Sequence, residues 1–175
     1  MVASHNESTI WIAKHCAPTV EEFVARMNEK AAQLGMTSTK YYNTSGLPGY
    51  GSTPDNSSSS RDLLLLGMEI TKHAQLMKIT SIPYATVSNG KFKTTYRNHN
   101  GLVINYNDEV DGIKTGHLKD SKYSIAVTKK KDNRRIIAVV SGLPTMSSRA
   151  ESSKLLLNSA FNKIITIVIN AYICN

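Results

Sequence analysis

Apolar positions near the start of the chain recur at the spacing of an α-helix. Thr19 and Glu22 form a capping box, which marks a helix start, and Gly35 is well placed to end the helix. Between these signals the apolar residues fall on one helical face: Val20, Phe23, Val24, Met27, Ala31 and Leu34. The pattern therefore predicts a first helix that ends just before Gly35.

A second helix is predicted to begin near Ser59, with Asp62 in its first turn. Its apolar stripe comprises Leu63, Leu66 and Ile70. The segment before it, residues 43–60 (NTSGLPGYGSTPDNSSSS), is rich in the residues that turns require. Its serine run also fits a flexible linker between domains. We prefer a loop within one domain, because neither flank is long enough to be a convincing domain alone.

Beyond residue 80 the pattern changes to short stretches that fit β-strands: 82–87, 92–96, 109–115, 123–128 and 135–140. Ser88-Asn89-Gly90, between the first two stretches, is a hairpin signal. Helical spacing returns from Ser148 to Phe161. The order of helices, strands and a final helix predicts an α/β protein with a mainly antiparallel sheet flanked by helices.

Composition and charge narrow the class of protein. The chain has 175 residues, 41% of them hydrophobic, which is enough for one globular domain with a core. The formal net charge of +8 favours anionic partners, whether nucleic acid, lipid head groups or an acidic polymer. Only 7% of residues are aromatic and no groove-reading helix stands out, so nucleic acid is the weakest of these interpretations. The densest basic run, residues 129–135, is predicted to be a solvated hairpin tip.

Metal and cofactor chemistry has no support in the sequence. Cys16 and Cys174 form no CxxC pair, and the five histidines include no HExxH motif. We therefore expect neither a metal site nor a cofactor.

The apolar run at residues 164–169 is far shorter than the roughly 20 residues that a membrane-spanning helix needs.

Two tripeptides carry the candidate chemistry. Ser4-His5-Asn6 and Lys114-Thr115-Gly116, in this order, resemble the second and third motifs of the penicillin-binding enzymes, whose set is S-x-x-K, S-x-N and K-T-G. Further stretches resemble consecutive segments of the serine-type D-alanyl-D-alanine carboxypeptidases, the low-molecular-weight penicillin-binding proteins: FVARMNEKAAQLGMTSTKYYNTSGLP, SSSRDLLLLG, NHNGLV, VDGIKTGH and RRIIAVVSGLPTMSSRAESSKLLLNSAF. The resemblance covers the chain up to about Lys163 and implies part of a β-lactamase/transpeptidase-like domain.

The resemblance also implies a substrate and roles for these residues. The substrate is a peptidoglycan stem peptide ending in D-Ala-D-Ala, attacked by a serine that forms an acyl-enzyme, and β-lactams acylate the same serine. Lys114 is expected to supply positive charge near the substrate carboxylate and to help proton transfer. Thr115 is expected to hydrogen-bond that carboxylate, and Gly116 keeps the strand edge bare for the peptide. Ser4 is expected to relay a proton to the leaving amine, and Asn6 to hold the substrate amide.

Three further residues follow from the resemblance. Arg149 matches a family arginine near the carboxylate, with an exposed arginine in the first turn of the last helix as the alternative. His117 follows the triplet as in the family and is placed at the rim of the cleft. The family usually has arginine where His99 stands. We expect this change to weaken anion binding near neutral pH, because the unperturbed pKa of histidine is about 6.5.

The first family motif, S-x-x-K, has no helical counterpart in these residues. One match exists, Ser88-Asn89-Gly90-Lys91, but it falls on the predicted hairpin turn and is interpreted as spurious. We therefore expect residues 1–163 to be the C-terminal portion of the catalytic domain and residues 164–175 to be a divergent apolar tail. Two hypotheses follow: a truncated enzyme served by an upstream fragment, or a non-enzymatic remnant that binds peptides or a partner chain.

Location follows from the same resemblance. Family members work in the periplasm or at the outer face of the cytoplasmic membrane. This sequence begins without the charged and apolar regions of a signal peptide, which favours a cytoplasmic location for the chain itself.

Overall fold

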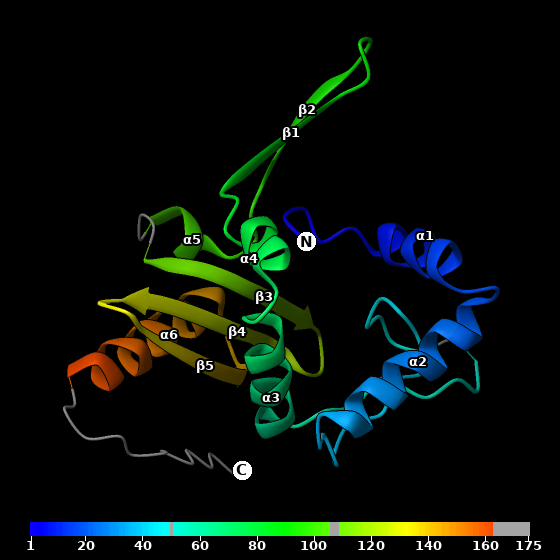
Figure 1. The fold of residues 1–175 in the computed structure, drawn as a ribbon, viewed down its shortest axis with the longest axis horizontal. Helices are drawn as coiled ribbons and strands as arrows, with labels where there is room; N and C mark the ends of the chain where they lie inside the picture. The colour runs from blue at the N-terminus through cyan, green and yellow to red at the C-terminus, as the bar shows by residue number, and fades with distance from the viewer. Residues whose placement is uncertain (50, 106–108, 163–175) are drawn as a thin grey trace.

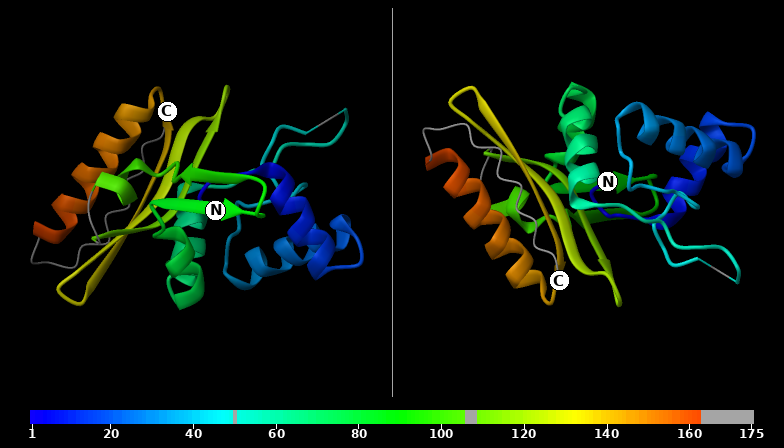
Figure 2. Two further views of the ribbon diagram at one scale, coloured as in Figure 1. Left: turned by 90° about the horizontal axis from the view of Figure 1, so that it is seen from above. Right: turned by 90° about the horizontal axis from the view of Figure 1, so that it is seen from below.

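A three-stranded antiparallel sheet forms the centre of the molecule. The computed structural model describes residues 1–49, 51–105 and 109–162 (Figure 1). The sheet has the order β3-β4-β5, from strands Val110–Leu118, Lys122–Lys131 and Arg134–Leu143. Helix α6 (Met146–Asn162) covers one face of the sheet, and helix α3 (Ser60–Ile70) packs against the other (Figure 2).

The core lies between the sheet and α6. Leu157 of α6 is 2% exposed, and Val127 at the middle of β4 is fully buried. The cluster around them also contains Leu102, Val103, Val110, Ile125, Ala138 and Val140. Burying such side chains stabilises the fold by roughly 1.5–3 kcal/mol each, so this layer fixes the sheet against α6.

The two strands that flank the basic run are longer than predicted. Lys129 and Arg135 lie inside β4 and β5, and the turn between the strands is formed by Asp132 and Asn133, both with positive φ. Lys129 is 8% exposed and pairs with Glu109. The prediction of a solvated tip is therefore wrong for this lysine, because an acidic residue beside β3 neutralises it.

Arg135 is the second member of the basic run that is paired. Its guanidinium donates to both carboxylate oxygens of Asp111 on β3, at 2.8 and 2.7 Å, and to Thr128 Oγ1 at 2.7 Å. A bidentate pair of this kind fixes geometry as well as charge. Two residues of the basic run therefore join β4 and β5 to acidic partners at this end of the sheet, in addition to those that face solvent.

Two helices lie to the side of the sheet, α1 (Asn6–Cys16) and α2 (Val20–Gln33) (Figure 1). The predicted capping signal is confirmed: Thr19 Oγ1 accepts from the Glu22 backbone N–H at 3.1 Å. Gly35, with φ of 72°, follows the end of α2 as predicted. Helix α1 was not predicted, and its Trp11 is 72% exposed.

The remaining elements connect α3 to the sheet. Helix α4 (Ala74–Thr80) packs on β3, and β1 (Tyr84–Ser88) pairs with β2 (Lys93–Arg97) in the predicted hairpin. The hairpin projects from the body of the molecule (Figure 1). A one-turn helix, α5 (Gly101–Asn105), then leads toward β3. The short helices α4 and α5 were not predicted, because too few residues carry their apolar pattern.

The serine-rich segment before α3 is a folded loop. The Asn56 side-chain oxygen accepts from the backbone N–H groups of Tyr42 and Asn43, and Lys40 pairs with Ser57 as an isolated bridge. These bonds close the loop at its base, so it is not a flexible linker. The division into residues 1–163 and an apolar tail stays a prediction, since the tail lies outside the described residues.

No helix among the described residues has both the length and the apolar character to cross a membrane.

A buried carboxylate joins α3 to the end of α2. Asp62 is 1% exposed and accepts from the Ser38 N–H and the Thr39 hydroxyl, both at 2.8 Å. Burial by itself raises the pKa of Asp62, but the hydrogen bonds from Thr39 and Ser38 outweigh it and lower the pKa below its ordinary value. The folded chain therefore keeps this carboxylate charged.

Asp62→Ala is expected to lower the free energy of unfolding by about 2–3 kcal/mol, because it leaves buried donors without an acceptor. Urea denaturation followed by circular dichroism measures the change. Asp120→Ala, at an exposed turn between β3 and β4, is the matched control and should change stability by less than about 0.5 kcal/mol. Equal effects of the two substitutions would show that Asp62 is not a structural anchor.

Candidate functional site

The structure brings together two of the predicted site segments that are 110 residues apart in the sequence. Lys114 lies on β3, and its Nζ donates to Ser4 Oγ at 2.6 Å and to the Thr115 carbonyl at 2.7 Å. Ser4 adopts a positive φ of 52°, just before α1 begins at Asn6. The prediction that Ser4 faces the Lys-Thr-Gly strand is confirmed. Asn6 makes no side-chain hydrogen bond to β3 among the described residues.

The Lys-Thr-Gly triplet sits on an outer strand of the sheet. β3 pairs with β4 alone among the described strands, so its other edge is not part of a ladder. Thr115 is buried, whereas Gly116 and His117 are exposed. Outer strands present unpaired backbone groups to which an extended peptide can hydrogen-bond. This strand can therefore offer a cation, a hydroxyl and bare backbone to one ligand.

A rigid loop places His99 beside these residues. The side chain of Asn98 donates to the carbonyls of Thr80 and Ile82, at 3.1 and 2.9 Å. The side chain of Asn100 donates to the carbonyl of Gly112 on β3, at 3.1 Å. His99 stands between these two buried asparagines, with its backbone N–H bonded to the Val2 carbonyl at 3.4 Å. The loop and the N-terminal segment are thus tied together at the site.

Arg149 lies in the first turn of α6 and is 6% exposed. Its Nη1 donates to the Ser124 carbonyl at 3.5 Å, and its guanidinium lies 5.7 Å from the centre of the Tyr123 ring. The alternative of an exposed arginine on the last helix is therefore wrong. This guanidinium is held inside the molecule near the start of β4.

The charges of the site are of one sign. Burial, and then the charge of Arg149, lower the pKa of Lys114. Burial, and then the charges of Lys114, Arg149 and His5, lower the pKa of His99. Within the described residues neither Lys114 nor Arg149 forms a salt bridge with an acidic side chain. Cations held together without an anion make a site that is chemically suited to bind one.

The S-x-x-K match at Ser88–Lys91 is not a nucleophile site. Ser88 ends β1, and the Asn89 side chain accepts from the backbone N–H groups of Lys91 and Phe92, at 3.2 and 2.9 Å. Gly90 has φ of 86°, as a hairpin turn requires. No helix starts here, and the hairpin points away from the sheet (Figure 1). The prediction of a spurious match is confirmed.

Three residues of the site were not found from the sequence: Tyr123, Asn98 and Asn100. Tyr123 lies directly opposite His117 in the β3–β4 register, and their rings are 4.0 Å apart between centres. Counting pairs outward from the short turn between these strands would have found it. The asparagines carry no such signal, since their partners are backbone carbonyls distant in the sequence.

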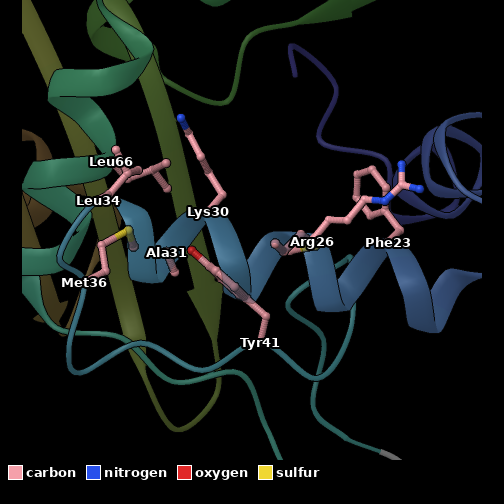
Figure 3. A pocket seen from close by; sticks show the side chains of 9 residues that line it. Phe23, Arg26, Lys30, Ala31, Leu34, Met36, Tyr41 and Leu66 are labelled. Atoms are coloured by element: carbon pink, nitrogen blue, oxygen red, sulfur yellow. The ribbon is translucent and has the colours of Figure 1, made fainter.

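A second hollow lies apart from the Lys114 site, between α2 and α3. It has a cavity volume of about 360 Å³ and is lined mainly by apolar side chains (Figure 3). Its α2 wall is one helical stripe of Phe23, Met27, Ala31 and Leu34, and Leu66 of α3 stands opposite. These four residues belong to the apolar face predicted from the sequence, so part of that face borders an open hollow, while Val24 of the same face is buried.

Residues 1–49, 51–105 and 109–162 contain no group of three or more His, Cys, Asp or Glu side chains that could hold a metal ion.

The fold is that of the penicillin-binding proteins. Penicillin-binding protein 6B from Escherichia coli superposes with a TM-score of 0.84 at 28% identity, over 98% of this chain and 52% of that one. Penicillin-binding protein D2 from Listeria monocytogenes, solved in a cefotaxime-bound form, superposes with a TM-score of 0.81 at 26% identity, over 92% and 63%. The prediction of a partial transpeptidase-like domain with an antiparallel sheet and flanking helices is confirmed.

Sequence comparison gives the family. The D-alanyl-D-alanine carboxypeptidase family model matches residues 1–145, so the chain belongs to that family. The D-alanyl-D-alanine carboxypeptidase DacF of Bacillus subtilis is 31% identical over 162 residues, which are 93% of this chain and 41% of that protein. The chain thus spans about two fifths of the length of this relative.

Ion pairs at Glu69 join α3 to Lys30, one of the residues that line the α2–α3 hollow. Glu69 of α3 pairs with Lys30 of α2 at 3.1 Å and with Lys72 at 3.0 Å. Hydrogen bonds from Lys72 and then Lys30 lower the pKa of Glu69 from 4.5 to about 2. Because the folded pKa is the lower one, these contacts stabilise the fold above pH 4.5, and the contribution is lost as the pH falls toward 2.

Glu69→Gln is expected to make stability less sensitive to acid, because the variant has no carboxylate to protonate between pH 4.5 and 2. Thermal unfolding measured across this range checks it, with Glu29→Gln on the exposed face of α2 as the control. The same loss of melting temperature in Glu69→Gln and in the unaltered chain would contradict the assignment.

Proposed function

We propose that this chain forms the substrate-binding half of a serine D-alanyl-D-alanine carboxypeptidase site, acting on peptidoglycan stem peptides that end in D-Ala-D-Ala. The observation that carries the proposal is a pair of cations beside an outer strand, half-buried Lys114 and buried Arg149, neither of which pairs with a carboxylate among the described residues. The C-terminal carboxylate of such a peptide is the anion that this arrangement lacks. Thr115 adds a hydroxyl donor to the same end of the strand.

We propose a role for each group that is consistent with this geometry. A peptide lying along the outer edge of β3 would hydrogen-bond to the backbone near Gly116 and direct its carboxylate toward Lys114, Thr115 and Arg149. Ser4 Oγ, 2.6 Å from Lys114 Nζ, is placed to pass a proton toward the leaving amine. The lowered pKa of Lys114 makes its proton easier to transfer to this hydroxyl. Asn6, at the start of α1, is proposed to hold the substrate amide.

In the acyl-transfer reaction itself, a serine hydroxyl attacks the penultimate carbonyl, D-alanine leaves, and water hydrolyses the acyl-enzyme. β-Lactams carry a carboxylate beside a reactive carbonyl and are expected to use the same anion site. Cell-wall peptide as substrate places the working site outside the cytoplasm, in the periplasm or at the outer face of the membrane.

The anion site is tested by comparing two ligands that differ in one group. An acylated D-Ala-D-Ala peptide with a free carboxylate should bind more tightly than its C-terminal amide, measured by calorimetry. Lys114→Met should reduce affinity for the carboxylate peptide by about 10- to 100-fold and leave the amide unaffected, because a charge-assisted hydrogen bond contributes about 1.5–3 kcal/mol. Lys130→Met, exposed on β4, is the matched charge control. Equal binding of the two peptides would overturn the proposal.

The nucleophile is proposed to come from polypeptide beyond these 175 residues, the part of the family fold that carries S-x-x-K. Two open surfaces support this. The apolar stripe of α2 and Leu66 border an open hollow of about 360 Å³. β5 pairs with β4 alone among the described strands, although α3 and α6 pack on it. An apolar helix suits the first surface and an added strand suits the second.

A second candidate function is a binding module without turnover. It is favoured by one observation: the S-x-x-K match in these residues lies on a hairpin turn rather than a helix. Such a module would bind stem peptides, or a partner chain, through the same cations. Nucleic-acid binding ranks last, and would require affinity that falls steeply with salt.

Fluorescent penicillin distinguishes these candidates. The chain is labelled alone and after co-expression with the S-x-x-K segment of Bacillus subtilis DacF. Label on that segment only when both are present would support a complemented enzyme. Label on this chain alone would place the nucleophile among its own serines. No label in either case, with carboxylate-dependent peptide binding retained, would support the binding module.

A variant in the hollow tests the docking surface. Met27→Glu should reduce complemented labelling by about tenfold or more, because docking would bury an unpaired carboxylate. Ala32→Glu lies on the exposed side of α2 and should leave labelling unchanged. Equal labelling of the two variants would show that the hollow does not receive the segment.

A further inference from the structure

We propose that Tyr123 is a positioning residue that holds the Arg149 guanidinium in place for the substrate carboxylate. The inference rests on the proposed function, because it assumes that Arg149 meets an anion. It assigns a role to a residue outside the S-x-N and K-T-G motifs. It also explains how a buried arginine is kept ready before any substrate arrives.

Tyr123 stands where three elements meet. It belongs to β4, lies opposite His117 of β3 and is close to Arg149 of α6. The rings of His117 and Tyr123 are 4.0 Å apart between centres, with an angle of 30° between their planes. The Arg149 guanidinium lies 5.7 Å from the centre of the Tyr123 ring. One aromatic ring thus contacts both a rim residue of the site and its buried cation.

Arg149 depends on this ring because its other partners are few. At 6% exposure, its guanidinium has lost most of its hydration. Among the described residues its one hydrogen bond is to the Ser124 carbonyl, at the long distance of 3.5 Å, and it has no acidic partner. A guanidinium has five donors, so most remain free for a ligand. The ring face attracts the cation without using any of these donors.

The backbone next to Tyr123 is shaped for this contact. Tyr123 pairs with Leu143 and Ile125 pairs with Val140, so Ser141 and Gly142 together oppose Ser124. Gly142 has φ of 74°, a conformation that favours glycine. A bulge of this kind bends the strand and redirects neighbouring side chains. Here it lies just before the turn into α6, which carries Arg149.

If the Tyr123 ring only fills space, its loss should lower stability alone. If it positions Arg149, its loss should lower affinity for the carboxylate peptide and not for the amide. The affinities of the carboxylate peptide and of its amide are therefore measured for three chains: unaltered, Tyr123→Leu and Tyr123→Phe. Tyr123→Leu should lose about tenfold in affinity for the carboxylate peptide and nothing for the amide. Tyr123→Phe keeps the ring and should stay within about threefold of the unaltered chain.

Two further variants complete the test. Arg149→Gln alone should lower carboxylate affinity, and Tyr123→Leu added to it should cause no further loss, because the two residues act as one unit. Tyr84→Leu, at an exposed tyrosine of the hairpin, is the control for loss of an aromatic ring. Retained amide binding in Tyr123→Leu shows that the site is still folded.

The results distinguish a failure of the proposed function from a failure of the positioning role of Tyr123. No preference for the carboxylate in the unaltered chain would overturn the proposed function and this inference with it. A preference that Tyr123→Leu leaves intact would overturn the inference alone. Equal loss for both peptides would also overturn it, because that result assigns Tyr123 to the fold and not to Arg149.

Discussion

The hydrogen bond between Lys114 and Ser4 joins the beginning of the chain to an outer strand of the sheet, across a sequence separation of 110 residues. It fixes the N-terminal segment against β3, and that segment also accepts from the His99 backbone. The bond is made by a lysine that burial and Arg149 both disfavour as a cation. The site is thus assembled around a charge that no carboxylate of the described residues neutralises.

Other buried or partly buried charges, away from this site, have partners within the chain. Asp62 is buried but accepts several hydrogen bonds, and Arg135 is matched by both carboxylate oxygens of Asp111. These groups stabilise the fold because each has its partner inside the chain. Lys114 and Arg149 have no acidic partner among the described residues, although each costs free energy to desolvate. Partly or fully buried cations without an acidic partner indicate a site that gives up some stability for ligand binding.

The apolar surfaces also include some that are covered within the chain and some that are open. The core between the sheet and α6 is well packed, with Val127 fully buried and Leu157 2% exposed. The apolar stripe of α2 instead borders an open hollow, and the outer edge of β5 is not part of a ladder among the described strands. Penicillin-binding protein 6B from Escherichia coli, which superposes on this chain, is about twice its length. Polypeptide that completes this fold would cover both surfaces.

Local sequence signals determined much of the fold. The capping box at Thr19 and the Asn-Gly hairpin each depend on neighbours in the sequence, so they could be read from it. The short helices α4 and α5 depend on packing against the sheet and left too weak a pattern. The extension of β4 through Lys129 was missed because its partner Glu109 lies in the turn before β3, distant in the sequence.

The residues of the candidate site also differ in whether the sequence alone could reveal them. The sequence by itself determined the family and the residues of the S-x-N and K-T-G motifs, because these are short and contiguous. Only the tertiary structure decided that Lys114 meets Ser4, that Arg149 is buried, and that Tyr123 stands beside it. Each of these contacts joins elements that are distant in the chain. Burial and the loss of hydration depend on everything packed around a residue, and a linear pattern does not contain that information.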